Sequence, residues 1–125
     1  MKLVSYLNKK EERLGILFNN KVYDLQKSAS TIKIILPSTM KKFLEGEENS
    51  MKLARKVFDS IKKEKIKSGL KYNQLTLLSP VPNPTSLRDG YAFRQHVFTA
   101  RRNRGVEMIP EFDQFPVFYF GNHNS

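Results

Sequence analysis

The alternation of side chains along the first part of the chain predicts a small antiparallel sheet. Side chains alternate in residues 2–7, and two further β-rich runs, 13–18 and 21–25, flank the pair Asn19-Asn20. Asparagine tolerates the positive φ that a tight hairpin turn requires, so the three runs are expected to form a meander. A sheet this small is marginal by itself, and we expect the following segments to cover its apolar face.

Apolar side chains at three- and four-residue steps predict helices after the sheet. Asp24 is expected to cap a short helix through Ala29, and a second helix is expected over Met40 to Leu44, where Gly46 would end it. The clearest helix follows, and its apolar stripe consists of Met51, Ala54, Val57, Phe58 and Ile61. Such a stripe usually faces a core, so we interpret it as packing.

The pattern changes at Gln74, after a lysine-rich segment that is expected to be a solvated helix end and linker. Leu75–Leu78 is expected to be a short buried strand, and the three alternating prolines at 80, 82 and 84 favour a stiff, extended connector. We therefore predict a small N-terminal domain in residues 1–73 and the beginning of a second domain in residues 74–125.

Residues 86–104 are expected to form one helix, with Ser86 as N-cap, Asp89 in the first turn and arginines at the end. In a continuous helix Asp89 and His96 lie on nearly the same face, about 10 Å apart along the axis. That spacing suits two groups acting on opposite sides of one small ligand. The same pattern also fits a different interpretation, in which Asp89 is an ordinary first-turn residue of a helix and His96 has a structural role. Beyond the helix, the aromatic run Val117 to Phe120 is expected to be a buried strand.

Composition narrows the class of protein. The 125 residues are 39% hydrophobic and 27% charged, which is typical of a soluble globular protein. There is no cysteine, which excludes disulfides and thiolate metal sites and suits a reducing compartment, so we expect a cytoplasmic protein. The apolar runs are far too short to span a bilayer, and no membrane association is expected.

The formal net charge of +10 raises the question of a polyanionic partner. Nucleic-acid binding through the basic clusters is a third and less favoured alternative, because no zinc-finger spacing, glycine-lysine loop or aromatic RNA-binding signature accompanies the charge. A solvated basic face explains the lysines of residues 52–71, while the arginines of residues 101–104 could instead bind an anionic small substrate.

Several motifs in chain order resemble the fumarylacetoacetate hydrolase family. They are Leu78-Ser79-Pro80-Val81-Pro82, Arg88 through Val97, Ala100-Arg101 with Arg104-Gly105, Pro110-Glu111, and Phe115 through Phe120. Residues 2–6 and 22–25 are similar to the small N-terminal domain of that family. The resemblance implies an α+β fold, in which a small N-terminal antiparallel β-sheet domain with flanking helices precedes the first helix and strand of a mixed β-roll catalytic domain.

The resemblance also implies a chemistry. Members of the family use a divalent metal (Mg, Ca or Mn) in the hydrolytic C–C cleavage of small carboxylates such as 2,4-dioxo acids and acylpyruvates. Asp89 matches a carboxylate ligand of the metal, and His96 matches the imidazole that activates water as general base. Tyr91 and Tyr119 align with tyrosines that line the substrate pocket, and Arg104 lies close to a position where an arginine holds a substrate carboxylate.

The chain departs from the family pattern after Tyr119, because the Glu-x-Glu pair and the further Asp that complete the metal site do not follow. We therefore expect an N-terminal fragment that is inactive by itself. The aromatic residues 117–120 would then need a missing C-terminal domain or a second subunit, as in a homo-oligomer. The alternative is an inactive interaction module or remnant that pairs with another subunit.

Overall fold

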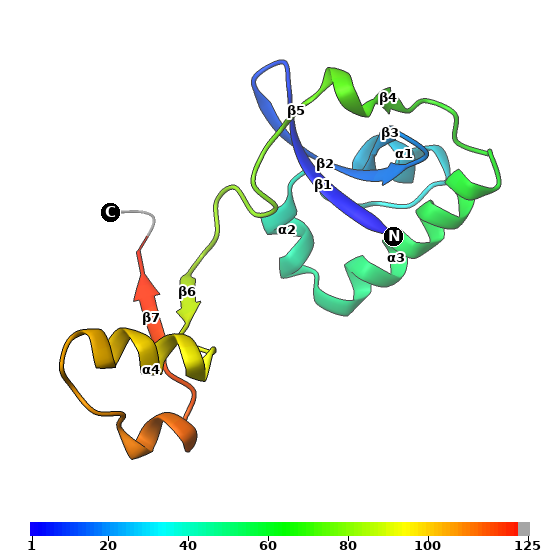
Figure 1. Ribbon diagram of the computed structural model, residues 1–125. Coiled ribbons are helices and arrows are strands. Elements are labelled where there is room, and N and C mark those ends of the chain that lie inside the picture. The colour runs from blue at the N-terminus through cyan, green and yellow to red at the C-terminus, as the bar shows by residue number, and fades with distance from the viewer. Residues whose placement is uncertain (123–125) are drawn as a thin grey trace. The chain divides into compact units, whose positions relative to one another are not determined.

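The computed structural model describes residues 1–122, which form two compact units (Figure 1). The first unit is Met1–Asn83, and the second begins at Pro84. Both units contain strands and helices, so the predicted α+β class is confirmed.

The sheet of the first unit is built on the predicted three-stranded meander. Strands β1 (Lys2–Asn8), β2 (Glu11–Phe18) and β3 (Lys21–Asp24) pair antiparallel in sequence order. Asn19 and Asn20 connect β2 to β3 with φ angles of 46° and 56°. These are the positive values that a two-residue hairpin requires, which explains why two asparagines occupy the turn.

Two short strands extend the meander to the order β4-β3-β2-β1-β5. Strand β4 (Leu70–Lys71) pairs with β3 and lies in the segment expected to be a linker, and β5 (Thr76–Leu77) pairs with β1. The expected buried strand at 75–78 is therefore shorter, and its two residues are exposed because it forms an edge of the sheet. Because β5 belongs to the first sheet, the units divide at Asn83–Pro84 rather than at Gln74.

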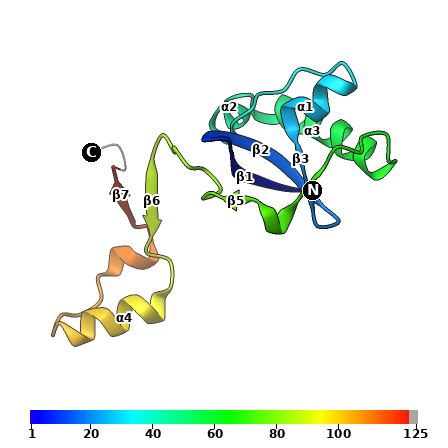
Figure 2. The ribbon, with the colours of Figure 1, turned by 90° about the horizontal axis from the view of Figure 1, so that it is seen from above.

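Three helices lie on one side of the meander (Figure 2). They are α1 (Leu25–Thr31), α2 (Met40–Glu45) and α3 (Glu47–Lys62). Asp24 caps α1 as predicted, since its carboxylate accepts a hydrogen bond from the backbone N–H of Lys27. The predicted stripe of α3 faces the core, where its buried members meet side chains of β2, β3, α1 and α2; the buried core includes Leu14, Ile16, Leu25, Ala29, Met40, Phe43, Ala54, Val57 and Ile61.

The second unit contains a strand pair and two helical segments. These are β6 (Leu87–Gly90), α4 (Arg94–Asn103), the 3-10 helix η2 (Pro110–Asp113) and β7 (Phe118–Gly121). The prediction of one helix over residues 86–104 is therefore wrong in its first part. β6 pairs antiparallel with β7, and this distant, aromatic partner overrides the local helix signals of Ser86 and Asp89.

β7 is a strand, as expected, but it is not buried. Tyr119 is 75% exposed and Phe120 is 66% exposed. The two-stranded sheet leaves the outer edge of β7 without a paired strand among the described residues. Within residues 1–122, no helix has the length and apolar character needed to cross a membrane.

Candidate functional site

Strand pairing brings together two of the five residues that the resemblance singled out. Asp89 of β6 lies directly opposite Tyr119 of β7. Residues that face each other across an antiparallel pair project from the same side of the sheet, with Cβ atoms about 5 Å apart. Both side chains are exposed. A carboxylate and a phenol therefore share one accessible face of the hairpin.

Tyr91 contacts His96. The backbone N–H of Tyr91 donates to the carbonyl oxygen of Val117 at 3.0 Å, which continues the strand pairing by one residue. Its ring meets the imidazole of His96 edge to face, with 6.2 Å between the ring centroids. His96 lies in the first turn of α4 and is exposed. The prediction that Asp89 and His96 share one helix face is therefore wrong, because Asp89 lies on strand β6 and His96 lies on helix α4. Tyr91 lies in the segment that connects β6 to α4.

Arg104 lies apart from His96. It is the C-cap residue of α4, and its backbone N–H donates to the carbonyl oxygen of Arg101 at 3.0 Å. The rise of an α-helix separates Arg104 from His96 by about 12 Å along the axis. The arginine is therefore at the opposite end of α4 from the imidazole.

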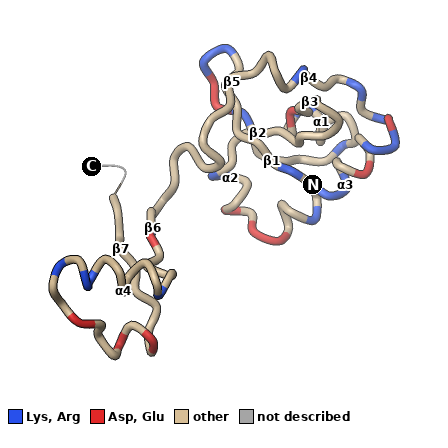
Figure 3. The backbone as a smooth tube through the Cα atoms, in the orientation of Figure 1, with Lys and Arg blue, Asp and Glu red and all other residues tan. Residues whose placement is uncertain are grey.

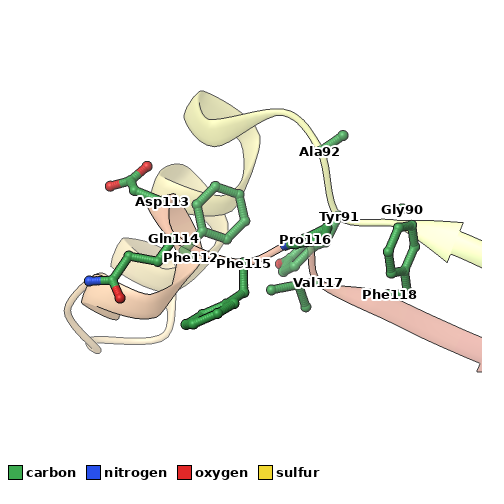
Figure 4. Close-up of a pocket in the computed structure, with 10 residues that line it drawn as sticks. All are labelled: Gly90, Tyr91, Ala92, Phe112, Asp113, Gln114, Phe115, Pro116, Val117 and Phe118. Carbon is green, nitrogen blue, oxygen red and sulfur yellow. The ribbon is translucent and has the colours of Figure 1, made fainter.

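A pocket opens beside Tyr91 (Figure 4). Its volume is about 280 Å³, and its lining comes from residues 90–92 and 112–118. Figure 4 labels the aromatic rings of Tyr91, Phe112, Phe115 and Phe118 in this lining. The rings of Tyr91 and Phe112 meet edge to face with centroids 6.3 Å apart. Of the five candidate residues only Tyr91 lines this pocket.

An ion pair connects the two helical segments around the pocket. The guanidinium group of Arg94, the first residue of α4, donates to both carboxylate oxygens of Asp113 in η2 at 2.8 and 3.1 Å. The hydrogen bonds from Arg94 and its charge hold the pKa of Asp113 below the usual range. The sequence analysis did not predict this ion pair, because Arg94 and Asp113 are distant along the chain. The aromatic run before Phe120 was the sole sequence signal that the segment around Asp113 is packed.

The donor groups fit a hard divalent cation in type but not in number. Asp89 offers carboxylate oxygens, which Mg²⁺, Ca²⁺ and Mn²⁺ prefer. In the part of the chain that the structure describes, no three His, Asp or Glu side chains form a group that could hold a metal ion. One exposed carboxylate is insufficient, so any such site requires oxygen ligands from elsewhere.

The comparisons with known proteins do not assign the site. No protein-family model matches the sequence, and no curated protein matches it. The site is therefore defined by its own residues: the facing pair Asp89 and Tyr119, and the contact between Tyr91 and His96.

Proposed function

We propose that this chain forms the N-terminal part of a metal-dependent hydrolase that resembles fumarylacetoacetate hydrolases. The reaction is the hydrolytic C–C cleavage of a 2,4-dioxo acid or an acylpyruvate-like carboxylate. The setting is the reducing cytoplasm, which suits the cysteine-free sequence.

One observation carries the proposal. The β6–β7 pair and the first turn of α4 hold a carboxylate, an imidazole and two phenols within one small unit: Asp89 faces Tyr119, and Tyr91 contacts His96. An imidazole titrates near neutral pH and can take a proton from water, whereas phenols can donate hydrogen bonds to substrate oxygens. These are the groups that cleavage of a dicarbonyl acid needs, apart from the remaining metal ligands.

The proposal assigns roles to the residues of this chain. Asp89 supplies one oxygen ligand, His96 acts as the base, and Tyr91 and Tyr119 contact the substrate. A divalent metal, when bound, would polarise the substrate carbonyl. Arg104 would bind a substrate carboxylate only if the substrate or another chain segment reached the far end of α4, so its role is the least supported by the geometry.

Manganese relaxation tests the half-site. Mn²⁺ broadens nuclear magnetic resonance signals close to where it binds, even when binding is weak. We expect titration of the full chain with Mn²⁺ to broaden the amide signals of β6 and of the start of α4 first. Asp89→Asn should remove this selective broadening. Asp113→Asn is the matched control in the same unit, because Asp113 is also exposed but is paired with Arg94.

Two outcomes would overturn the assignment. One is equal broadening around all exposed carboxylates, and the other is β6 broadening that survives in Asp89→Asn. Since one carboxylate cannot complete the site, the chain alone is expected to hydrolyse no acylpyruvate. If the purified chain does hydrolyse an acylpyruvate and Asp89→Asn does not reduce the rate, the proposed role of Asp89 is contradicted.

A second candidate is a non-catalytic interaction module that pairs with another subunit. The exposed aromatic side chains of β7 favour it, because an unpaired strand edge can accept a further strand. Its test is the molar mass in solution, where we expect an assembly larger than the monomer. Phe120→Pro should dissociate it, because the register directs the N–H of Phe120 to the outer edge of β7, where proline removes a donor. A monomer at all concentrations would count against this candidate.

A further inference from the structure

Two lysines face each other at the edge of the first sheet. Lys21 of β3 lies directly opposite Lys71 of β4 in the antiparallel register. Like charges in this position repel each other and destabilise the sheet. Within residues 1–122, no ion pair joins either lysine to a carboxylate. The edge therefore concentrates positive charge that the described part of the chain does not neutralise.

The backbone holds the two lysines in this arrangement. A Cβ atom on Gly69 would lie 2.9 Å from Cβ of Lys21 and 3.0 Å from ring atoms of Tyr23, so the absence of a side chain lets β4 approach β3. On the other side of Lys71, the backbone N–H of Tyr72 donates to the carbonyl oxygen of Asn20 at 3.0 Å. The backbone positions of the two facing lysines are thus fixed from both sides.

A cavity lies beside the lysine pair. Its volume is about 390 Å³, within the range of small-molecule sites, and it is lined by Asn19, Asn20, Lys21, Lys71, Tyr72 and Asn73. Tyr72 is 38% exposed, so part of its ring is available to a ligand. The lining residues thus include two lysines, three asparagines and one tyrosine.

The surroundings of this cavity are mostly basic. An adjoining cavity of about 310 Å³ shares Lys21 and also contains Lys67 and one carboxylate, Glu64. Figure 3 shows basic positions along β4 and along the loop that leads to it from α3, interrupted by an acidic one. Every lysine of the chain lies at or before Lys71, so this charge belongs to the first unit.

We propose that the cavity at the β3–β4 edge binds the phosphate group of a nucleotide. The phosphate accepts hydrogen bonds from the ammonium groups of Lys21 and Lys71 and offsets their repulsion. The ring of Tyr72 offers a stacking surface for the base, and the asparagine carboxamides can donate to and accept from the remaining polar atoms. The nucleotide is either free or part of a single strand, and the two sources share this chemistry.

The test is a titration of the full chain with inorganic phosphate, adenosine monophosphate and a short single-stranded oligonucleotide at constant ionic strength. Amide signals of residues 19–21 and 71–73 report binding. We expect selective shifts of these signals, and we expect Lys21→Gln and Lys71→Gln each to weaken binding about tenfold, as the loss of a charged hydrogen bond does. Lys56→Gln on the exposed side of α3 removes the same charge and should leave the affinity unchanged.

The three probes of the titration distinguish a free nucleotide from a nucleotide within a single strand. Tighter binding of the monophosphate than of inorganic phosphate, lost in Tyr72→Ala, supports a free nucleotide. Tighter binding of the oligonucleotide than of the monophosphate at the same salt supports a single strand. The proposal is overturned if none of the three probes shifts these signals, or if Lys56→Gln weakens binding as much as Lys71→Gln does, because the effect is then one of overall charge.

Discussion

The guanidinium group of Arg13 donates to both carboxylate oxygens of Asp24, at distances of 2.8 and 2.9 Å. The Asp24 carboxylate also accepts hydrogen bonds from the hydroxyl group of Tyr6 and from the backbone N–H of Lys27. Burial alone would raise the pKa of this carboxyl, but the hydrogen bonds from Arg13, Lys27 and Tyr6 outweigh it and hold the pKa below its usual range. One ionised side chain thus connects β1, β2, β3 and the start of α1.

The removal of this carboxylate should destabilise the first unit. Asp24→Ala leaves the partly buried Arg13 without its counter-charge and removes the N-cap of α1, and we expect a loss of about 3 kcal/mol in the free energy of unfolding. Urea denaturation, followed through the amide signals of β1–β3, measures it. Asp59→Ala, which breaks the exposed pair with Lys62, should have little effect. Equal losses in the two variants would contradict a special role of Asp24.

The same carboxyl should make stability depend on pH in the acid range. Its pKa is lower in the folded chain than the value of about 3.9 in an unfolded one. The stabilisation is therefore fully present above about pH 4 and is lost as the pH falls from there through the folded-state pKa. The urea midpoint of the natural sequence should fall over this window, and that of Asp24→Asn should fall less. Parallel curves for the two proteins would count against this.

Two glycine substitutions should differ in their effects. Gly69→Ala places a Cβ against Lys21 and Tyr23, so we expect β4 to detach and stability to fall by about 2 kcal/mol. At Gly90 the nearest atom to an added Cβ is a ring carbon of Phe118 at 3.7 Å, an ordinary contact, so Gly90→Ala should be tolerated. Amide hydrogen exchange in β4 and β6 distinguishes them; faster exchange is expected in β4 of Gly69→Ala alone.

The ion pair beside the pocket should be visible in a titration. The carbon-13 carboxyl signals of the aspartates follow their individual pKa values. Arg94→Gln removes the hydrogen bonds and the charge that depress the pKa of Asp113, so this pKa should rise toward the ordinary range. The pKa of Asp59, which Lys62 depresses, should stay where it was. An unchanged Asp113 in the variant would show that the pair does not persist in solution.

Local chemistry made much of the first unit predictable. The Asn19-Asn20 turn, the Asp24 cap and the apolar stripe from Met51 to Ile61 are each set by neighbouring residues, and the structure has all three. The two-residue strand β4 was not predicted, since it carries no periodicity of its own. Strand β5 was predicted at residues 75–78, but as a longer and buried strand. Both strands exist because the edges of the meander offer unpaired backbone groups to whatever extended segment passes by.

The candidate site was predictable in its residues but not in its geometry. Ser86 and Asp89 are good helix-starting residues, yet β6 forms because Arg88 and its neighbours meet β7, far along the chain. The guanidinium group of Arg88 lies 5.2 Å from the ring centroid of Phe120, a cation–π contact that supports this register. The helix signals of residues 86–104 are local, so they cannot predict that this segment pairs with β7. The roles assigned to Asp89 and His96 remain a proposal.

The two sheets differ in how their outer strands resist unwanted growth. Lys71 places a charge on β4, one of the two edge strands of the five-stranded sheet, and the other edge strand, β5, has only two residues. A charged side chain and a very short strand both discourage the addition of another molecule. β7 carries Phe118, Tyr119, Phe120 and Gly121, with no charge. In concentrated solution, or on a newly made chain, self-association should therefore begin at β7. Whether the chain is bound by a chaperone, pairs with a partner or aggregates then depends on which molecule binds that strand first.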